Sequence, residues 1–357
     1  MLNIERIIAE LKNYQGSPLK LMEVCGTHTS AIMQLGIRSL ISPKITLVSG
    51  PGCPVCVTPA AFIDAAVAIA CEPGYTVLSF GDMFKVPGNG PSLSEGKGEG
   101  ASVEMIYSPR EVLVKAEQES DKVFVVAAVG FETTLPAYCD LLQELEQREI
   151  RNVRLLTSLR QIIPALSWLG THSPDIDGYI LPGHVSVILG EDAYKSLAQE
   201  LKTPMAIAGF STEHILLAIY DLVKQVQNKK NQVHNLYPSV VSRTGNTLIQ
   251  EQMEQYFQKG QIGWRGLGLI EDSGLFLRDE YTQFSMPYDW PEPNETAEDF
   301  KDSCLCGEVL LGRISPPECP SFRKHCTPSM PKGPCMISLE GACGIWYRFH
   351  REKKEGQ

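Results

Sequence analysis

The sequence contains no feature that would direct the chain into or across a membrane. No apolar run approaches the ~20 residues that a membrane-spanning helix requires. The N-terminal residues Met1 to Arg6 lack the order of basic, apolar and small residues that makes a signal peptide. We therefore expect a cytoplasmic protein. In that compartment cysteines serve metal binding or redox chemistry more often than structural disulfides.

Positive charge is also in short supply. The 357 residues include 32 Lys and Arg against 42 Asp and Glu, which gives a net charge of −10. An excess of negative charge argues against nucleic acid or an anionic membrane as a general partner. The remaining composition, with 43% hydrophobic and 21% charged residues, is that of a globular protein long enough for two or three domains.

Strand and helix patterns alternate along the first two thirds of the sequence, an order typical of a parallel α/β sheet. The expected strands are residues 19–24, 45–48, 75–80, 103–107, 123–129, 153–156, 178–181 and 205–208. We expect two Rossmann-like α/β domains, at residues 1–120 and 121–235. Residues 236–357 are expected to hold a small, irregular C-terminal region, rich in proline and cysteine from residue 287 onward. The segment 86–100, with five glycines and two prolines, predicts a long loop.

Two cysteines lie on the turn that follows one of these strands. Gly50-Pro51-Gly52 forces the turn, and Cys53-Pro54-Val55-Cys56 comes next. Thr58 and Pro59 then form a helix-start signal, a hydroxyl cap followed by proline at the first helical position. The N-terminus of the expected helix, residues 60–70, favours thiolate over thiol. We interpret Cys53 and Cys56 as a reactive pair.

Other polar side chains also follow expected strands. Ligand sites in open α/β sheets lie beyond the carboxyl ends of the strands. The residues placed there are Cys25, His28, Cys53, Cys56, Asp82, Glu132, Thr133, Thr134 and His184. Taken singly, each has an ordinary explanation: His184 is a half-buried histidine, Glu132 a helix-start carboxylate and Asp82 a turn residue. Their convergence at strand ends favours a shared site.

The first four thiol and imidazole groups allow more than one interpretation. Cys25 and His28 are three residues apart, as are Cys53 and Cys56, so the four have acceptable spacing for tetrahedral zinc. The alternative is a redox dithiol at Cys53 and Cys56 beside a separate metal-binding thiolate at Cys25. We favour the second, because structural zinc sites lie mostly in small irregular modules. Buried, inert cysteines are a third alternative.

A second group of cysteines lies near the C-terminus, among prolines. Its members are Cys304, Cys306, Cys319, Cys326, Cys335 and Cys343. All-thiolate ligation suits either zinc or an iron–sulfur cluster. Spacing alone selects neither the metal nor the four residues that would bind it.

Several motifs, taken together, resemble the HypD family of hydrogenase maturation factors. The matching stretches are Met22-Glu23-Val24-Cys25-Gly26-Thr27-His28-Thr29, Ser49-Gly50-Pro51-Gly52-Cys53-Pro54-Val55-Cys56, Phe80-Gly81-Asp82-Met83, Gly130-Phe131-Glu132-Thr133-Thr134 and Ser338-Leu339-Glu340-Gly341-Ala342-Cys343. They extend over nearly the whole chain. One position departs from the family: many members carry a second histidine where this chain has Ser30.

The resemblance implies an assembly factor for the Fe(CN)2CO unit of nickel–iron hydrogenases, a scaffold with redox activity rather than a conventional turnover enzyme. In that family the ligands of a [4Fe–4S] cluster follow Cys-x12-Cys-x6-Cys-x16-Cys, a spacing that fits Cys306, Cys319, Cys326 and Cys343. Cys25 would hold the iron together with a cysteine of the small chaperone HypC, and HypE would donate cyanide.

The same resemblance assigns supporting roles to the remaining site residues. A polar wall around the iron would consist of His28, Asp82, Glu132, Thr133, Thr134 and His184. The dithiol and the cluster would supply or store electrons, and the hydrogenase large subunit would be an indirect partner. The competing interpretations are a stand-alone thiol–disulfide oxidoreductase and a zinc-stabilised scaffold.

Overall fold

The computed structural model of the chain describes residues 3–173, 175–287 and 304–350. The protein is α/β and divides into two compact units. Unit 1 consists of the described residues within Met1–Cys53, Leu169–Gly245 and Ser303–Gln357. Unit 2 consists of those within Pro54–Trp168 and Asn246–Asp302.

The sheet of unit 1 has five parallel strands in the order β2-β1-β7-β8-β9. These strands are β1 (Leu19–Glu23), β2 (Ile45–Ser49), β7 (Gly178–Pro182), β8 (Met205–Ala208) and β9 (Val233–Asn235). Strand β1 pairs on one side with β2, where Leu21 lies opposite Leu47. On its other side it pairs with β7, where Met22 lies opposite Tyr179.

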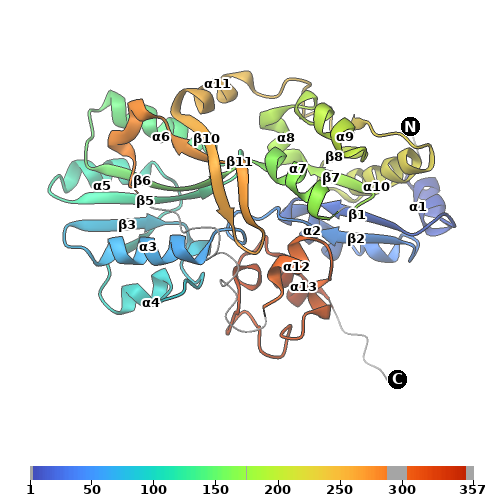
Figure 1. Cartoon of the computed structure of the whole chain (residues 1–357), viewed down its shortest axis with the longest axis horizontal. Coiled ribbons are helices and arrows are strands. Elements are labelled where there is room, and N and C mark those ends of the chain that lie inside the picture. Colours follow the sequence, from blue (N-terminus) through green and yellow to red (C-terminus); the bar gives the residue numbers. More distant parts are fainter. Residues whose placement is uncertain (1–2, 174, 288–303, 351–357) are drawn as a thin grey trace. The chain divides into compact units, whose positions relative to one another are not determined.

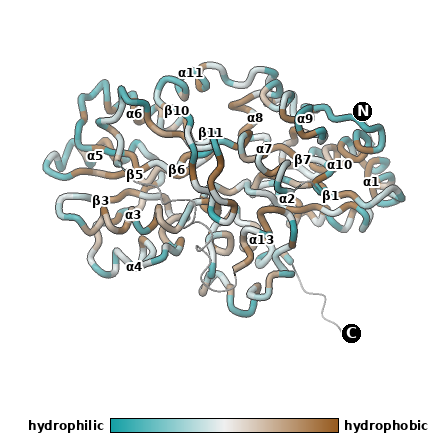
Figure 2. The backbone as a smooth tube through the Cα atoms, in the orientation of Figure 1, coloured by the Kyte–Doolittle hydropathy of each residue, from teal (hydrophilic) through white to brown (hydrophobic). Residues whose placement is uncertain are grey.

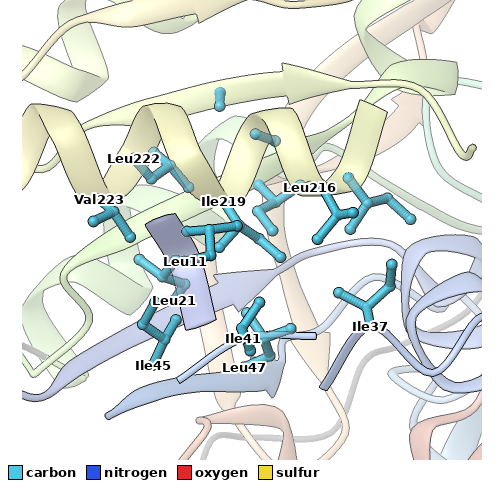
Figure 3. Close-up of a cluster of buried hydrophobic side chains, with 14 of the residues drawn as sticks. Leu11, Leu21, Ile37, Ile41, Ile45, Leu47, Leu216, Ile219, Leu222 and Val223 are labelled. Atoms are coloured by element: carbon cyan, nitrogen blue, oxygen red, sulfur yellow. The ribbon is translucent and has the colours of Figure 1, made fainter. Parts of the chain in front are cut away.

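Helices of unit 1 lie along the faces of this sheet (Figure 1), and several of them share an apolar core with its strands. They include α1 (Ile4–Lys12), α2 (Gly26–Gln34), α8 (Gly183–Leu189), α9 (Lys195–Leu201) and α10 (Thr212–Gln227), while α7 (Ile162–His172) crosses the unit boundary. Apolar residues recur along α10 at helical spacing, so one face can be buried. Figure 3 shows Leu216 and Ile219 of that face above Leu21 and Leu47 of the strands.

The sheet of unit 2 has six strands in the order β10-β11-β6-β5-β3-β4. They are β3 (Tyr75–Ser79), β4 (Val103–Met105), β5 (Val123–Gly130), β6 (Val153–Arg160), β10 (Phe257–Trp264) and β11 (Gly268–Leu277). The first four are parallel, and the β10–β11 hairpin adds to β6 in the antiparallel direction. Figure 2 shows β5 as a hydrophobic stretch, as expected for a strand buried on both faces.

The α-helices that lie wholly within the described residues of unit 2 are α3 (Ala60–Cys71), α4 (Leu93–Gly98), α5 (Glu111–Gln118), α6 (Leu135–Gln147) and α11 (Thr247–Tyr256). Helix α4 lies where a long loop was expected. Ser92 and Glu95 form a capping box, in which the Ser92 hydroxyl oxygen accepts from the Glu95 amide at 3.3 Å and a Glu95 carboxylate oxygen accepts from the Ser92 amide at 2.8 Å. This capping box favours a helix more strongly than the neighbouring glycines disfavour one.

The described C-terminal residues belong to unit 1. They form α12 (Cys306–Leu310), the single turns η6 (Pro316–Glu318) and η7 (Pro334–Met336), and α13 (Ala342–Phe349). A small apolar core of Phe322, Cys326, Met336 and Trp346 holds them together. The scarcity of regular structure agrees with expectation for residues 304–350, whereas residues 288–303 lie outside the described part.

The two units do not follow the expected boundaries at residues 120 and 235. Each unit combines segments that those boundaries keep apart, because β1 and β2 pair into a sheet with β7, β8 and β9, whereas β3, β4, β5 and β6 form another. The crossover connections determine which strands become neighbours in a parallel sheet. The sequence of a single strand does not encode its neighbours. Over the described ranges, every helix is too short or too polar to span a bilayer.

Candidate functional site

The expected site residues are divided between the two units. Unit 1 contains Cys25, His28, Cys53, His184, Cys306, Cys319, Cys326 and Cys343. Unit 2 contains Cys56, Asp82, Glu132, Thr133 and Thr134. The unit boundary therefore falls inside the Cys53–Cys56 motif, and the two sets of residues have distinct surroundings.

Cys25 lies just beyond the carboxyl end of β1, at the N-cap position of α2. Its side chain is buried, with 8% of its surface exposed. Burial raises the pKa of the thiol to about 11, while hydrogen bonds from the backbone of His28 and Thr27 act in the opposite direction. The N-terminus of a helix stabilises an anion, so this position holds a buried thiol that a bound cation can convert to thiolate.

The buried side chain of Glu23 makes hydrogen bonds that hold the Cys25 loop in place. One Glu23 oxygen accepts from the Cys25 amide at 3.4 Å, and the other accepts from the Thr29 hydroxyl at 2.5 Å. Burial raises the pKa of Glu23 to about 7, opposed in part by the Arg38 guanidinium. That guanidinium lies 4.8 Å above the ring of Trp346 in α13. Neither Glu23 nor Arg38 is among the site residues expected from the sequence.

His28 and His184 both contact the ring of one phenylalanine, Phe210. The rings of His28 and Phe210 have their centroids 4.6 Å apart, and those of His184 and Phe210 are 4.1 Å apart. Burial lowers the pKa of both histidines, that of His28 to about 4, so both are neutral at pH 7. Phe210 comes directly after Gly209, beyond the end of β8, but an aromatic residue there carries no sequence signal of function.

The protonation of His28 follows from its hydrogen bond. Its Nε2 lies 3.0 Å from the carbonyl oxygen of Gly209, which can only accept, so Nε2 carries the proton. Nδ1 is then an unprotonated acceptor, buried and without a hydrogen-bond partner. This nitrogen, one helical turn from Cys25, can accept a hydrogen bond from a ligand, whereas burial disfavours its protonation.

The segment before α13 contacts both the Cys25 loop and Cys53. A Cβ at Gly26 would lie 2.3 Å from the carbonyl oxygen of Glu340, so glycine alone permits this packing. The Cys53 thiol, which is 3% exposed, lies 3.4 Å from the Ser338 hydroxyl oxygen. Helix α13, which begins two residues after Glu340, carries Cys343. Unit 1 thus places Cys25, Cys53 and the cysteine-rich segment against one another.

Cys53 and Cys56 form a disulfide. Both are disulfide-bonded, and the other nine of the eleven cysteines are in no disulfide, so these two are bonded to each other. The expected helix follows as α3, but its cap differs from expectation. Pro59 is the N-cap residue, and the Thr58 hydroxyl donates to the Pro54 carbonyl at 2.9 Å instead of capping the helix. The hydroxyl stabilises the turn between the two sulfurs.

The remaining expected site residues lie at the ends of two neighbouring strands of unit 2. Asp82 is in the turn η2 (Gly81–Met83) that follows β3, and it is partly exposed. Glu132 follows β5 and is fully buried, where one carboxylate oxygen accepts from the Ile162 amide at 2.8 Å. Burial raises the pKa of Glu132 to about 7. Thr134 is the N-cap residue of α6 but makes no side-chain capping bond.

The six C-terminal thiols form one sulfur-rich cluster. Cys343 is partly buried, and its pKa is raised well above the usual value by burial and by the thiols of Cys306, Cys304, Cys326 and Cys319. The sulfur atoms of Cys306 and Cys335 lie 2.9 Å apart. Cys335 is therefore in contact with an expected ligand although it lies outside the expected set.

Sulfur donors surrounded by Phe322, Met336 and Trp346 match the chemistry of an iron–sulfur cluster better than that of a hard cation. In the described residues the thiols are not arranged in metal-binding geometry, since no three Cys, His, Asp or Glu side chains form such a group. The donor set fits a soft metal.

Sequence comparison gives a consistent family relationship. The HypD family, described as "Hydrogenase formation hypA family", matches residues 2–350. The chain is 39% identical over 333 residues to the putative hydrogenase expression/formation protein of Methanocaldococcus jannaschii, covering 93% of this chain and 92% of that protein. It is 38% identical over 342 residues to the hydrogenase maturation factor HypD of Escherichia coli, covering 95% and 91% of the two chains. It is 35% identical over 350 residues to HypD2 of Bradyrhizobium diazoefficiens, covering 95% and 92%.

Proposed function

The chain belongs to the HypD family of hydrogenase maturation factors, and on that premise we propose that it assembles the Fe(CN)2CO unit of nickel–iron hydrogenases. In this role the protein is a scaffold on which iron acquires its ligands. The small chaperone HypC would share the iron, HypE would donate cyanide, and the hydrogenase large subunit would receive the finished unit. All three partners follow from the family resemblance.

The observation that supports this proposal most directly is the position of the Cys25 thiol. It lies at a helix N-terminus, where backbone hydrogen bonds from Thr27 and His28 favour its anion. Iron that carries cyanide needs a soft, anionic ligand, and a thiolate is one. A single protein thiolate leaves the other side of the iron open for the HypC cysteine. His28, neutral and with an unpartnered Nδ1, provides a hydrogen-bond acceptor beside the bound iron.

Electron transfer would use the sulfur atoms of two further groups. Cys53 and Cys56 can exchange two electrons between the disulfide and the dithiol. Cys306, Cys319, Cys326 and Cys343 would hold a [4Fe–4S] cluster, which supplies single electrons when bound. The contact between Cys53 and Ser338 supports a link between the dithiol and the segment that carries Cys343.

The iron site is tested by replacing Cys25 with alanine. Cyanide and carbon monoxide absorb in an infrared window where protein is nearly transparent. We expect the native protein, purified anaerobically with HypC, to show these bands and Cys25→Ala to show none. The variant should keep the visible absorption of its C-terminal cluster, because the two sites use different ligands.

A matched control is Cys71→Ala, which removes an exposed, free cysteine at the end of α3. This variant should retain the infrared bands and mature hydrogenase in cells. Retention of the bands and of maturation by Cys25→Ala would show that Cys25 is structural, and the proposed iron site would have to be abandoned.

The cluster ligands are tested by single serine substitutions in anaerobically prepared protein. We expect the substitutions at Cys306, Cys319, Cys326 and Cys343 each to abolish the brown colour, because four thiolates saturate the four irons. Cys304→Ser and Cys335→Ser should leave the spectrum intact. The contact between Cys306 and Cys335 makes one comparison decisive. If Cys335→Ser lost the colour and Cys306→Ser kept it, Cys335 would be the fourth ligand and the expected ligand set would be wrong.

A further inference from the structure

Unit 2 contains an arginine that is fully buried without a counter-charge. Arg160 is the last residue of β6 and has no exposed surface. Its Nη1 donates to the carbonyl and hydroxyl oxygens of Ser158 at 2.8 and 2.7 Å, and its Nη2 donates to the Gly263 carbonyl at 2.7 Å. Its Nε has no hydrogen-bond partner, and none of the ion pairs among the described residues includes Arg160.

A buried charge without a counter-charge is costly, so its presence calls for a physical reason. Burial lowers the pKa of Arg160 to about 9, which leaves the guanidinium positively charged at pH 7. All of its hydrogen-bond acceptors are neutral oxygens. The site therefore keeps a full positive charge in an interior of low polarity, where that charge acts strongly on any anion formed nearby.

A directed chain of hydrogen bonds leads from this charge to the disulfide turn. Arg160 donates to the Ser158 hydroxyl oxygen, so the Ser158 proton is free to point at the Thr58 hydroxyl oxygen, 3.5 Å away. Thr58 in turn donates to the Pro54 carbonyl at 2.9 Å, within the Cys53–Cys56 turn. The Val57 carbonyl, beside the fully buried Cys56, accepts from the Arg265 amide at 2.8 Å. The turn is thus anchored to the end of β6.

We propose that Arg160 is a positioning residue that stabilises the reduced form of the Cys53–Cys56 pair and so raises its reduction potential. The inference rests on the proposed redox function. An external dithiol gives two electrons, the S–S bond breaks, and the dithiol becomes a disulfide. The external dithiol loses two protons in this step. The Cys53 sulfur takes up one of them and the other is released to solvent, which leaves Cys56 as a thiolate. The disulfide is neutral and the thiolate is not, so the Arg160 charge favours the reduced state alone.

The test compares Arg160→Gln with the native chain in a redox titration. The full-length protein is equilibrated anaerobically with dithiothreitol buffers of graded potential, and the two thiols are trapped and counted by mass spectrometry. We expect the native pair to change state together. In Arg160→Gln the equilibrium constant for reduction should fall at least tenfold, which lowers the midpoint potential by about 30 mV.

Two further variants separate charge from shape. Arg160→Lys keeps the charge but not the forked hydrogen bonds, so it should recover most of the native potential. Arg154→Gln removes a partly exposed arginine nearer the other end of β6 and should leave the potential unchanged. If Arg160→Gln does not fold, Ser158→Ala replaces it, because loss of the relaying hydroxyl should lower the equilibrium constant at least threefold.

The outcomes distinguish this inference from the proposed function. A native midpoint in Arg160→Gln, or in Ser158→Ala where that variant is used, would overturn the role of Arg160 and leave the redox dithiol standing. Failure of the native Cys53 and Cys56 to change state together would overturn the redox dithiol itself, and the role of Arg160 with it.

Discussion

Gly52→Ala is expected to reduce hydrogenase maturation by at least a hundredfold. A Cβ at this position would lie 2.4 Å from the Cys25 nitrogen and 2.4 Å from the Val24 carbonyl carbon. Both are backbone atoms and cannot rotate away as a side chain would. The Cys25 loop must therefore shift, and a displacement of about 1 Å in a reacting group can cost a factor of about 100 in rate.

Maturation is measured as hydrogenase activity in cells whose own copy of the protein has been deleted. The purified complex with HypC should also lose its cyanide and carbon monoxide bands. The matched control is Gly98→Ala in α4, where an added Cβ meets nothing within 4 Å, so this variant should behave as native. Native maturation by Gly52→Ala would show that the position of the Cys25 backbone is not critical.

Glu132→Gln is expected to remove about 3 kcal/mol of pH dependence from the free energy of unfolding. Burial raises the pKa of Glu132 from 4.5 to about 7 in the folded protein. Below pH 4.5 the carboxyl is protonated in both the folded and the unfolded state, so it contributes no pH dependence. Between pH 4.5 and 7 the folded protein holds a proton that the unfolded chain has released. The contribution of Glu132 to the free energy of unfolding therefore falls as the pH rises. Above about pH 7 the full loss of about 3 kcal/mol is present.

The measurement is urea unfolding at a series of pH values from 5 to 8, with the native protein and Glu132→Gln compared under reducing conditions. The glutamine can still accept from the Ile162 amide, so its shape and hydrogen bond are kept while the charge is removed. Glu99→Gln, at an exposed position of the same unit, should remain parallel to the native curve. A Glu132→Gln curve parallel to the native one would show that Glu132 does not bind a proton on folding.

Individual elements with strong periodicity were predictable from the sequence. The β-branched run at residues 123–129, which was expected to form a strand, is β5, and the helix expected at residues 60–70 is α3. What the sequence could not supply was the order of the strands. The hydrophobic pattern of β1 is the same whether its neighbour is β3 or β7, and only the packing of whole units decides between them.

Short or paired elements were harder to predict. Strand β9 has only three residues and is stabilised by its pairing with the edge of β8. Its own sequence therefore carries no signal that predicts a strand. The β10–β11 hairpin contains glycines that weaken its strand signal, yet antiparallel pairing with β6 stabilises it. In each case a tertiary contact decides the structure, and that contact is made by residues far along the chain.

The site was predictable where chemistry marks the residue type. Cysteines at strand ends indicated Cys25 and Cys53, and the structure places both against the Ser338–Gly341 segment. Glu23 and Arg160 could not be recognised, because glutamate and arginine are by default surface residues in a sequence. Their importance depends on complete burial, which emerges only when strands from distant segments have packed around them.

The discontinuous build of unit 1 also has a consequence for its synthesis on the ribosome. Cys25 is made well before Glu340, whose backbone covers Gly26 and lies more than 300 residues further along the chain. At about 5–20 residues per second, the nascent chain carries an unfinished Cys25 loop for tens of seconds. The loop cannot close before Glu340 has been synthesised, so the rate of translation sets the earliest moment at which the thiol reaches its final surroundings.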